Sequence, residues 1–405
     1  MQNMISRCRA FISKPFFSDY RTLLGLWMII AIIGIKSIGH AGGNNYLIFK
    51  YVFWHVVEQV NLYMPDPTHY FDVNHYGPTF SLVIAPFAVM PTWLGMLLWN
   101  IFLVLGLWLA VRHSGMTHYQ QIFIYWFSCH ELFNAVMMQQ FNTAIAAIII
   151  ASFFLIEKEK DGWAAFLIVL GTVVKLYGIV GLAFFFFSKH KRRFILYFLL
   201  WTVVLVAAPM VISSPEYILS QYHAWMTALV EKNGENLESI KQNISVLGMV
   251  RRISGSETYS DLWILIPAMI LFFLPYLRIR QWKSLAFRET LLASVLMFVV
   301  LFSTGSENST YIIAIPGVVL WYTAAPWKRG PWAVALMVYV FIFTTMAHSD
   351  LIISPLRNGL IRPYALKALP VTIVWLRLCW EMMTKEYRNQ PRRGCSFINP
   401  KREEL

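Results

Sequence analysis

The sequence predicts an all-α protein that crosses a membrane many times, and three observations lead to this fold class. Of the 405 residues, 58% are hydrophobic and only 14% are charged, which is too apolar for an ordinary soluble domain. Uncharged windows of about twenty residues recur along the whole length, as helices that span a hydrocarbon core of about 30 Å require. The apolar runs are long and alternate weakly, which argues against the strands of an outer-membrane barrel.

We expect a single integral membrane domain over residues 1–405, with about 10 to 13 crossings. The first apolar window follows a basic N-terminus and has no small-residue cleavage site at its end, so we interpret it as a retained helix rather than a signal peptide. The predicted helices cover residues 22–40, 79–111, 119–137, 141–157, 162–187, 194–213, 262–277, 288–304, 310–325, 331–347 and 368–384.

The net charge of +13 indicates membrane topology rather than nucleic-acid binding, because the basic residues lie in short loops between apolar runs and in the tail 385–405. The positive-inside rule places these loops, the tail and the N-terminus in the cytoplasm. The two long loops that then face outward are residues 41–78 and 214–261. Both are net negative, which agrees with that assignment.

The path of the chain between residues 79 and 187 has two interpretations. If 79–111 is one broken crossing bent near Pro86 and Pro91, then 162–187 is a re-entrant hairpin whose apex lies near Lys175. If 79–91 and 92–111 are two short crossings, Lys175 lies midway through a long helix. We favour the hairpin, because it places every short basic loop inside and keeps Lys175 out of lipid.

The first outer loop holds the strongest candidates for acid–base chemistry. Its segment 46–60 has the pattern of an amphipathic helix on the membrane surface. The stretch "YFDVNHYGPTF" (70–80) then places Asp72 three residues before His75, next to Tyr76 and directly before an apolar run. A carboxylate and an imidazole at a helix mouth can act as a base or orient an acceptor hydroxyl.

Cations that could bind phosphate occur at two places. Lys175 in "GTVVKLYGIVG" lies far from either end of its apolar run, which argues against simple snorkelling and favours a buried anion such as a lipid phosphate. Arg251 and Arg252 in "NISVLGMVRRISG" lie in the second outer loop, and their forked donors suit phosphate oxygens. A solvated pair that balances the neighbouring acids is the alternative for the two arginines.

Uncharged polar groups that suit a sugar lie in "STGSENSTY" and "MQQFNT". They include Asn308 and Ser309 in the first and Gln140 and Asn142 in the second, and the carboxylate of Glu307 beside Asn308 is a further hydrogen-bond partner for a sugar. A capped turn and amides that join helices are the structural alternatives. No cofactor is indicated. A divalent metal on Asp72, Asp66 and Glu307 is conceivable, but no ligand spacing calls for one.

The sequence lacks the motifs of a soluble nucleotide-binding domain. It has no Walker loop, no dinucleotide fingerprint, no zinc-protease motif and no G-x-S-x-G elbow. Its four cysteines are scattered and form no visible disulfide or metal framework. The energy or group donor must therefore arrive another way, and a membrane-soluble donor satisfies that requirement.

The ordered segments "GGNNYLIFKYVFWHVVEQVNLY", "YFDVNHYGPTFSLVIAPFAVMP", "QQFNTAIAAIII", "GTVVKLYGIVGLAFFFF", "NISVLGMVRRISG" and "STGSENSTYIIAIPGVVLW" together resemble glycosyltransferase family 87. The resemblance runs from about residue 20 to 345, and the order of the segments is more specific than any one of them. It implies a helix bundle of GT-C type whose first outer loop carries catalytic residues. It also implies a polyprenyl-phosphate sugar donor bound near Lys175 and Arg251 or Arg252.

The chain departs from the family at one important place. Where many relatives have an aspartate after the first helix as general base, this chain has Asn44 and Asn45, and an amide cannot take a proton at neutral pH. The base is then Asp72 or His75, with Asp66 or Glu307 as less favoured candidates, or the protein is not a competent transferase. Asn44 and Asn45 can still orient the acceptor.

We therefore expect a multi-pass enzyme of the cytoplasmic membrane with its active site on the outer face. It would move a mannose-like hexose from a polyprenyl-phosphate donor to a lipid-linked or glycan acceptor. Membrane lipids would surround the protein as further partners. Asp72 would take the acceptor proton and His75 would assist, while Asn44, Asn45, Tyr76, Gln140, Asn142, Glu307 and Ser309 bind acceptor or sugar. Two alternatives remain: a transporter or flippase of lipid-linked saccharides, and an inactive scaffold in polysaccharide assembly. The absence of an internal repeat counts against a transporter.

Overall fold

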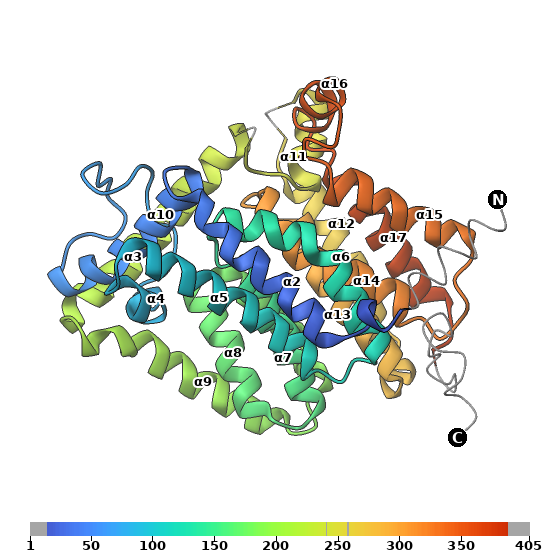
Figure 1. Ribbon diagram of the computed structural model, residues 1–405. Coiled ribbons are helices and arrows are strands. Elements are labelled where there is room, and N and C mark those ends of the chain that lie inside the picture. Colours follow the sequence, from blue (N-terminus) through green and yellow to red (C-terminus); the bar gives the residue numbers. More distant parts are fainter. Residues whose placement is uncertain (1–13, 240, 257–258, 388–405) are drawn as a thin grey trace.

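The computed structural model describes residues 14–239, 241–256 and 259–387, and within these ranges it consists of helices and connecting loops without strands (Figure 1). The predicted all-α class is confirmed. Most of the predicted basic tail, from residue 388 on, lies outside the described residues. The α-helices are α2 (Tyr20–Ile33), α3 (Ala41–Glu58), α4 (Phe80–Ala88), α5 (Thr92–Arg112), α6 (His118–Met137), α7 (Asn142–Glu157), α8 (Asp161–Val174), α9 (Lys191–Ala207), α10 (Pro215–Glu238), α11 (Val246–Ser254), α12 (Leu262–Phe273), α13 (Leu285–Leu301), α14 (Tyr311–Thr323), α15 (Pro331–Val340), α16 (Ser354–Leu356) and α17 (Ala368–Thr384).

The centre of the bundle is α14, which packs against α6, α7, α13 and α17. All its residues from Tyr311 to Trp321 are buried, as expected for a helix that is apolar on every side. Gly317 allows α14 to approach α13 closely, because a Cβ there would lie 2.7 Å from the carbonyl oxygen of Ala293. The core extends from α14 into both halves of the chain and includes fully buried residues of α2, α5 and α8.

Several helices begin and end where the apolar windows predict. Helices α6, α7 and α17 match the predicted ranges within about two residues at either end, which is the usual scatter of helix boundaries. In the part of the chain that the structure describes, three segments are long and apolar enough to cross a membrane: Tyr20–Ser37, Thr92–Arg112 and Lys191–Val211. The shorter apolar helices include α7, α8 and the segments Leu262–Leu277 and Pro331–Thr345. The predicted number of crossings stays a prediction.

The hairpin that was favoured over a straight helix is confirmed. Helix α8 ends at Val174, Lys175 is extended (φ −149°, ψ 112°), and the 3₁₀ helix Leu176–Phe187 folds back against α8. Gly171 and Gly178 make the close crossing possible, since a Cβ on Gly178 would lie 2.3 Å from the backbone carbon of Gly171. Lys175 is therefore at the apex of the hairpin.

Residues 79–111 pass once from one end of the molecule to the other. The chain enters beside the hairpin apex, where the Gly77 amide donates to the Val174 carbonyl oxygen (3.0 Å). It then forms α4, which at 1.5 Å per residue is too short to span a bilayer, and α5, which begins after Pro91. This agrees with the single broken crossing.

The short basic loops meet at one end of the bundle, which we call the basic end. Lys158 donates to the carbonyl oxygen of His113 (2.7 Å), and Lys189 pairs with Glu159 (2.6 Å). Arg288 pairs with Glu157 (2.6 Å) and also donates to the carbonyl oxygen of Trp282. These contacts join loops 112–115, 157–162, 188–193 and 278–283, so the loops that the charge pattern assigned to one side do lie together.

Candidate active site

Two adjoining pockets lie at the end of the bundle opposite the basic end. We call them the outer pocket (about 530 Å³) and the lysine pocket (about 380 Å³). The outer pocket is lined by Asn44, Asn45, Asp72 and Ser309, and the lysine pocket by Lys175. Both pockets share His75, Tyr76, Gln140, Gln242 and Glu307.

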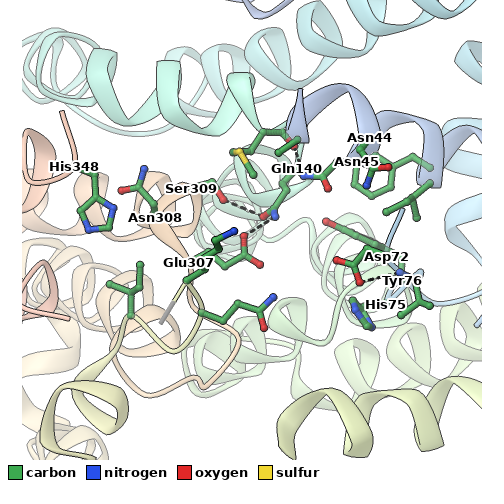
Figure 2. A pocket seen from close by; sticks show the side chains of 18 of the residues that line it. Asn44, Asn45, Asp72, His75, Tyr76, Gln140, Glu307, Asn308, Ser309 and His348 are labelled. Carbon is green, nitrogen blue, oxygen red and sulfur yellow. Dashed lines mark hydrogen bonds between the residues drawn. The ribbon is translucent and has the colours of Figure 1, made fainter. Parts of the chain in front are cut away.

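Figure 2 shows Asp72, His75 and Tyr76 on one side of the outer pocket and His348 with Asn308 on the other. Gln140 and Glu307 lie between the two sides, joined by a hydrogen bond. Most residues that the sequence singled out thus meet around one cavity, although they come from α3, the first outer loop, the turn before α7 and the loop before α14. The remaining question is what fixes their orientation.

Local hydrogen bonds fix the shape of the segment around Asp72. The Asn74 side chain accepts from the Tyr76 amide and donates to the Tyr76 carbonyl oxygen (both 2.9 Å), which closes a tight turn. Gly77 packs so closely that a Cβ there would meet the Val173 carbonyl oxygen at 2.0 Å. Asp72 itself is exposed and has a positive φ of 79°, an uncommon conformation for a residue with a side chain.

Asn44 holds the backbone directly before Asp72. Its Oδ1 accepts from the Phe71 amide (2.6 Å), and its Nδ2 donates to the Phe71 carbonyl oxygen (2.5 Å). Asn45 instead donates to the carbonyl oxygen of Met138 (2.9 Å). Asn44 therefore acts as a two-point clamp, since its amide provides both a donor and an acceptor whereas an ionised carboxylate only accepts.

Substitution of Asn44 by aspartate tests this clamp. A carboxylate at this position can still accept from the Phe71 amide, but it would face the Phe71 carbonyl oxygen without a donor. We expect Asn44→Asp to lower transfer activity by about tenfold, in line with the loss of a hydrogen bond of roughly 1–2 kcal/mol. Asn45→Asp, which leaves Phe71 untouched, is the comparison variant in the same activity assay. Higher activity in Asn44→Asp than in the parent protein would instead show that position 44 supplies the base.

Lys175 and Glu307 are connected through two amides. Lys175 Nζ donates to Asn142 Oδ1 (2.7 Å), and Asn142 Nδ2 donates to Gln140 Oε1 (2.7 Å). Gln140 Nε2 then donates to Glu307 Oε2 (2.8 Å), and Ser309 donates to Gln140 Oε1 (3.0 Å). Five predicted residues thus form one network, which connects the cation in the lysine pocket to a carboxylate in the wall that both pockets share.

The environment of Lys175 suits an anion from outside the chain. Its only direct hydrogen bond in the described residues goes to the neutral amide of Asn142, and no carboxylate there lies within ion-pair distance. The rings of Tyr76 and Tyr177 lie 5.4 and 5.1 Å from Nζ, which stabilises the ammonium without neutralising it. A cation in this position lacks a counter-charge that a substrate phosphate would supply.

The two titratable groups shared by the pockets differ in what they can do. Burial lowers the pKa of His75 to about 4, and the nearby ammonium of Lys232 acts in the same direction. His75 is therefore neutral at pH 7, and neither ring nitrogen has a hydrogen-bond partner in the described part of the chain. Burial raises the pKa of Glu307, while Lys175 and Gln140 partly oppose this effect. A neutral His75 that resists protonation is better suited to hydrogen bonding than to taking a proton.

Arg251 and Arg252 line neither pocket. Arg251 forms an ion pair with Asp261 (2.8 Å) and lies over the Tyr259 ring. Arg252 donates to the carbonyl oxygens of Ser239 (2.7 Å) and Gln242 (2.6 Å), so it holds the segment that brings Gln242 to both pockets. Direct binding of phosphate by these two arginines stays a prediction, and their contacts favour a supporting role.

The conceivable metal ligands do not lie around one centre. Asp66 accepts hydrogen bonds from His55 (3.2 Å) and His69 (2.6 Å), and these two contacts lower the pKa of Asp66 against the opposing effect of burial. This cluster does not line the outer pocket that Asp72 and Glu307 share. Within the described ranges, no three His, Cys, Asp or Glu side chains are arranged to hold a metal ion.

Residues 74–304, more than half of the chain, match the family model described as glycosyltransferase family 87. The chain belongs to glycosyltransferase family 87. The resemblance seen in the sequence is thereby confirmed, and the protein is a glycosyltransferase whose apolar helices indicate a membrane protein. A comparison with curated proteins finds no match.

The region matched by the family model divides the candidate site. It contains His75, Gln140 and Lys175, which line the shared wall and the lysine pocket. Asp72 lies just before the matched region and Glu307 just after it. The candidate site therefore extends beyond both ends of the matched region.

Several pocket residues were missed in the sequence. They are Lys232, Lys241, His348 and Arg362, which lie in loops or at the surface of helices where charge carries no special signal. Lys232 pairs with Glu235 (3.0 Å) at the lysine pocket. The spacing of these residues in the sequence does not indicate that they line the two pockets.

A buried ion pair, also missed, supports the loop that carries Glu307. Lys367 and Glu131 have no exposed surface and lie 2.7 Å apart. Lys367 Nζ also donates to Oδ1 (2.6 Å) and to the carbonyl oxygen (3.2 Å) of Asn308, the residue after Glu307. An acid within an apolar helix is a signal that a partner exists, so Glu131 could have been singled out from the sequence.

We expect Lys367→Met to destabilise the protein strongly. The substitution leaves the Glu131 carboxylate buried without its cation, and removing one partner of a buried pair costs about 3–5 kcal/mol. The double variant Glu131→Gln/Lys367→Met removes both charges and should recover most of the loss. Thermal unfolding of the purified protein measures the effect, with Lys385→Met as a control at an exposed lysine. Equal unfolding temperatures for parent and Lys367→Met would contradict this account.

Proposed function

We propose that this member of glycosyltransferase family 87 transfers a mannose-like hexose from a polyprenyl-phosphate donor to a lipid-linked or glycan acceptor. The observation that carries the proposal is the junction of the two pockets at Gln140 and Glu307. On one side of the junction lies a lysine that pairs with no carboxylate among the described residues, and on the other an exposed aspartate. This arrangement fits a phosphate leaving group on one side and an acceptor hydroxyl on the other.

The reaction we propose is a single displacement. The acceptor oxygen bonds to the anomeric carbon near the junction while Asp72 takes the hydroxyl proton. The bond between the anomeric carbon and the phosphate oxygen breaks, and polyprenyl phosphate leaves with the electron pair. Lys175, assisted by Lys232, stabilises the negative charge that develops on the phosphate. Attack from the side opposite the leaving group inverts the configuration of the sugar.

The proposed position in the membrane follows from the two ends of the bundle. The basic loops meet at one end and the pockets lie at the other, so the positive-inside rule favours pockets that open on the outer face of the cytoplasmic membrane. A bundle of GT-C type would hold the lipid-linked donor there, with the hairpin apex and Lys175 at the pocket. Arg252 would contribute by holding Gln242 in the shared wall.

The test uses the full chain in lipid nanodiscs with radiolabelled polyprenyl-phosphate mannose, followed by the glucose and arabinose analogues. Release of sugar to water or to an added lipid acceptor, with inverted configuration, supports the proposal. Saturable donor binding without any new glycosidic bond argues against a transferase. In that case, movement of the labelled lipid across the bilayer would identify a transporter, and its absence would leave a scaffold.

A further inference from the structure

A separate hollow of about 360 Å³ lies at the basic end, between the start of α8 and the first turns of α9. Its walls include Asp161 and Trp163 from α8, and Arg193, Tyr197 and Trp201 from α9. The hollow and the lysine pocket lie at opposite ends of the α8 hairpin. The apex of the hairpin is at the lysine pocket, and its base is at the hollow. It shares no lining residue with either of those pockets.

Asp161 is the unusual member of this wall. The residue is only 2% exposed, and neither carboxylate oxygen has a hydrogen-bond partner in the described residues. The N-terminus of α8 favours a negative charge at this position, but no helix N–H reaches the carboxylate. The neighbouring Glu159 is exposed and paired with Lys189 (2.6 Å). A buried carboxylate without donors indicates that a donor-bearing ligand belongs there.

The hollow also offers a cation and aromatic walls. Arg193 is exposed, and its guanidinium donates to the Tyr197 hydroxyl (3.3 Å) rather than to Asp161. Trp201 is fixed by its hydrogen bond to the Gly162 carbonyl oxygen (3.1 Å), and Trp163 is 61% exposed. A carboxylate and a guanidinium at one site match a ligand that carries an ammonium and a phosphate together. Aromatic rings add a favourable surface for the ammonium.

The position of the hollow points to a membrane lipid as the source of such a ligand. Helix α9 begins with Lys191, Arg192 and Arg193 and continues with apolar residues that face outward, including Leu196 (68% exposed) and Val203 (69% exposed). The segment is one of the three long enough to span a bilayer. The hollow therefore lies where a charged end meets a lipid-facing surface, which is the level of phospholipid headgroups and of interfacial tryptophans.

We infer that this hollow binds the headgroup of a phospholipid with a primary ammonium, such as phosphatidylethanolamine. Asp161 accepts N–H bonds from the ammonium, and Arg193 binds the phosphate. Phosphatidylcholine satisfies Asp161 poorly, because a quaternary ammonium has no N–H to donate. Phosphatidylglycerol brings no cation at all. The inference does not depend on the proposed transferase reaction.

The test measures lipid binding to the full chain, released from detergent, by native mass spectrometry. The lipids are phosphatidylethanolamine, phosphatidylcholine and phosphatidylglycerol with identical acyl chains. We expect phosphatidylethanolamine to bind at least about tenfold more tightly than the other two. Asp161→Asn should abolish this preference, whereas Glu216→Gln, a change at an exposed carboxylate that does not line the hollow, should retain it. Arg193→Gln should weaken all the phospholipids, since each carries a phosphate.

Two results would overturn the inference. Equal binding of phosphatidylethanolamine and phosphatidylcholine by the parent protein would show that no N–H donor is needed. An undiminished preference in Asp161→Asn would place the lipid elsewhere. The comparison among lipids uses the parent protein alone, so it tests the inference even if Asp161→Asn fails to fold.

Discussion

The substitution Asp72→Asn is expected to lower kcat of sugar transfer by about 10²- to 10⁴-fold, the range that loss of a general base produces. Asparagine keeps the size and the hydrogen bond that Oδ1 accepts from the Val73 amide (2.9 Å), but it cannot take the acceptor proton. Donor binding should change little, because Asp72 lines the outer pocket and not the lysine pocket. Initial rates and donor affinity in nanodiscs measure the two effects separately.

Asp66→Asn is the matched control for this prediction. Asp66 belongs to the same outer loop, but it contacts His55 and His69 and does not line the outer pocket. It should keep most of the activity. Full activity in Asp72→Asn together with loss in Glu307→Gln would assign the base to Glu307 instead. Since burial raises the pKa of Glu307, a base at that position would make the rate rise with pH through that raised value.

Asn44 and Asp72 illustrate how much of the site could be inferred from the sequence. The sequence shows that Asn44 cannot be a base, and it shows a carboxylate at Asp72 in the same loop. It cannot show that Asn44 holds the backbone directly before Asp72, because most of α3 and an irregular loop separate the two residues. The two hydrogen bonds from Asn44 to Phe71 supply that link. They support the proposal that Asn44 positions a base rather than replaces one.

Periodic apolar patterns predicted the helices well, because each helix must place a continuous apolar surface against the protein core or the lipid. The hairpin was predictable for a related reason, since a lysine in the middle of an apolar run demands either a break or a partner. The structure contains the break at Lys175. Contacts between loops follow no period, which is why Lys232 and His348 were missed and why Arg251 and Arg252 were expected at a pocket that they do not line.

Lys175→Met is expected to lower kcat by about 10²- to 10³-fold, the usual effect of removing one preorganised group that stabilises developing charge. Methionine keeps an unbranched side chain of similar length in the space beside Tyr76 and Tyr177, so the pocket should keep its shape. The substitution should weaken binding of the product, polyprenyl phosphate, more than binding of the donor substrate. Free polyprenyl phosphate carries more negative charge than the sugar-linked donor, so its inhibition constant should rise more than the donor KM.

Lys232→Met separates the specific role of Lys175 from a general effect of positive charge in the lysine pocket. Lys232 lines the same pocket but is already paired with Glu235 (3.0 Å), so its charge is partly compensated before any substrate binds. Its loss should therefore reduce kcat by much less than the loss of Lys175. Equal losses in the two variants would indicate that the pocket attracts the phosphate through its overall field. A larger loss in Lys232→Met would indicate that the phosphate binds near Lys232 rather than at the hairpin apex. The role assigned to Lys175 would then be wrong.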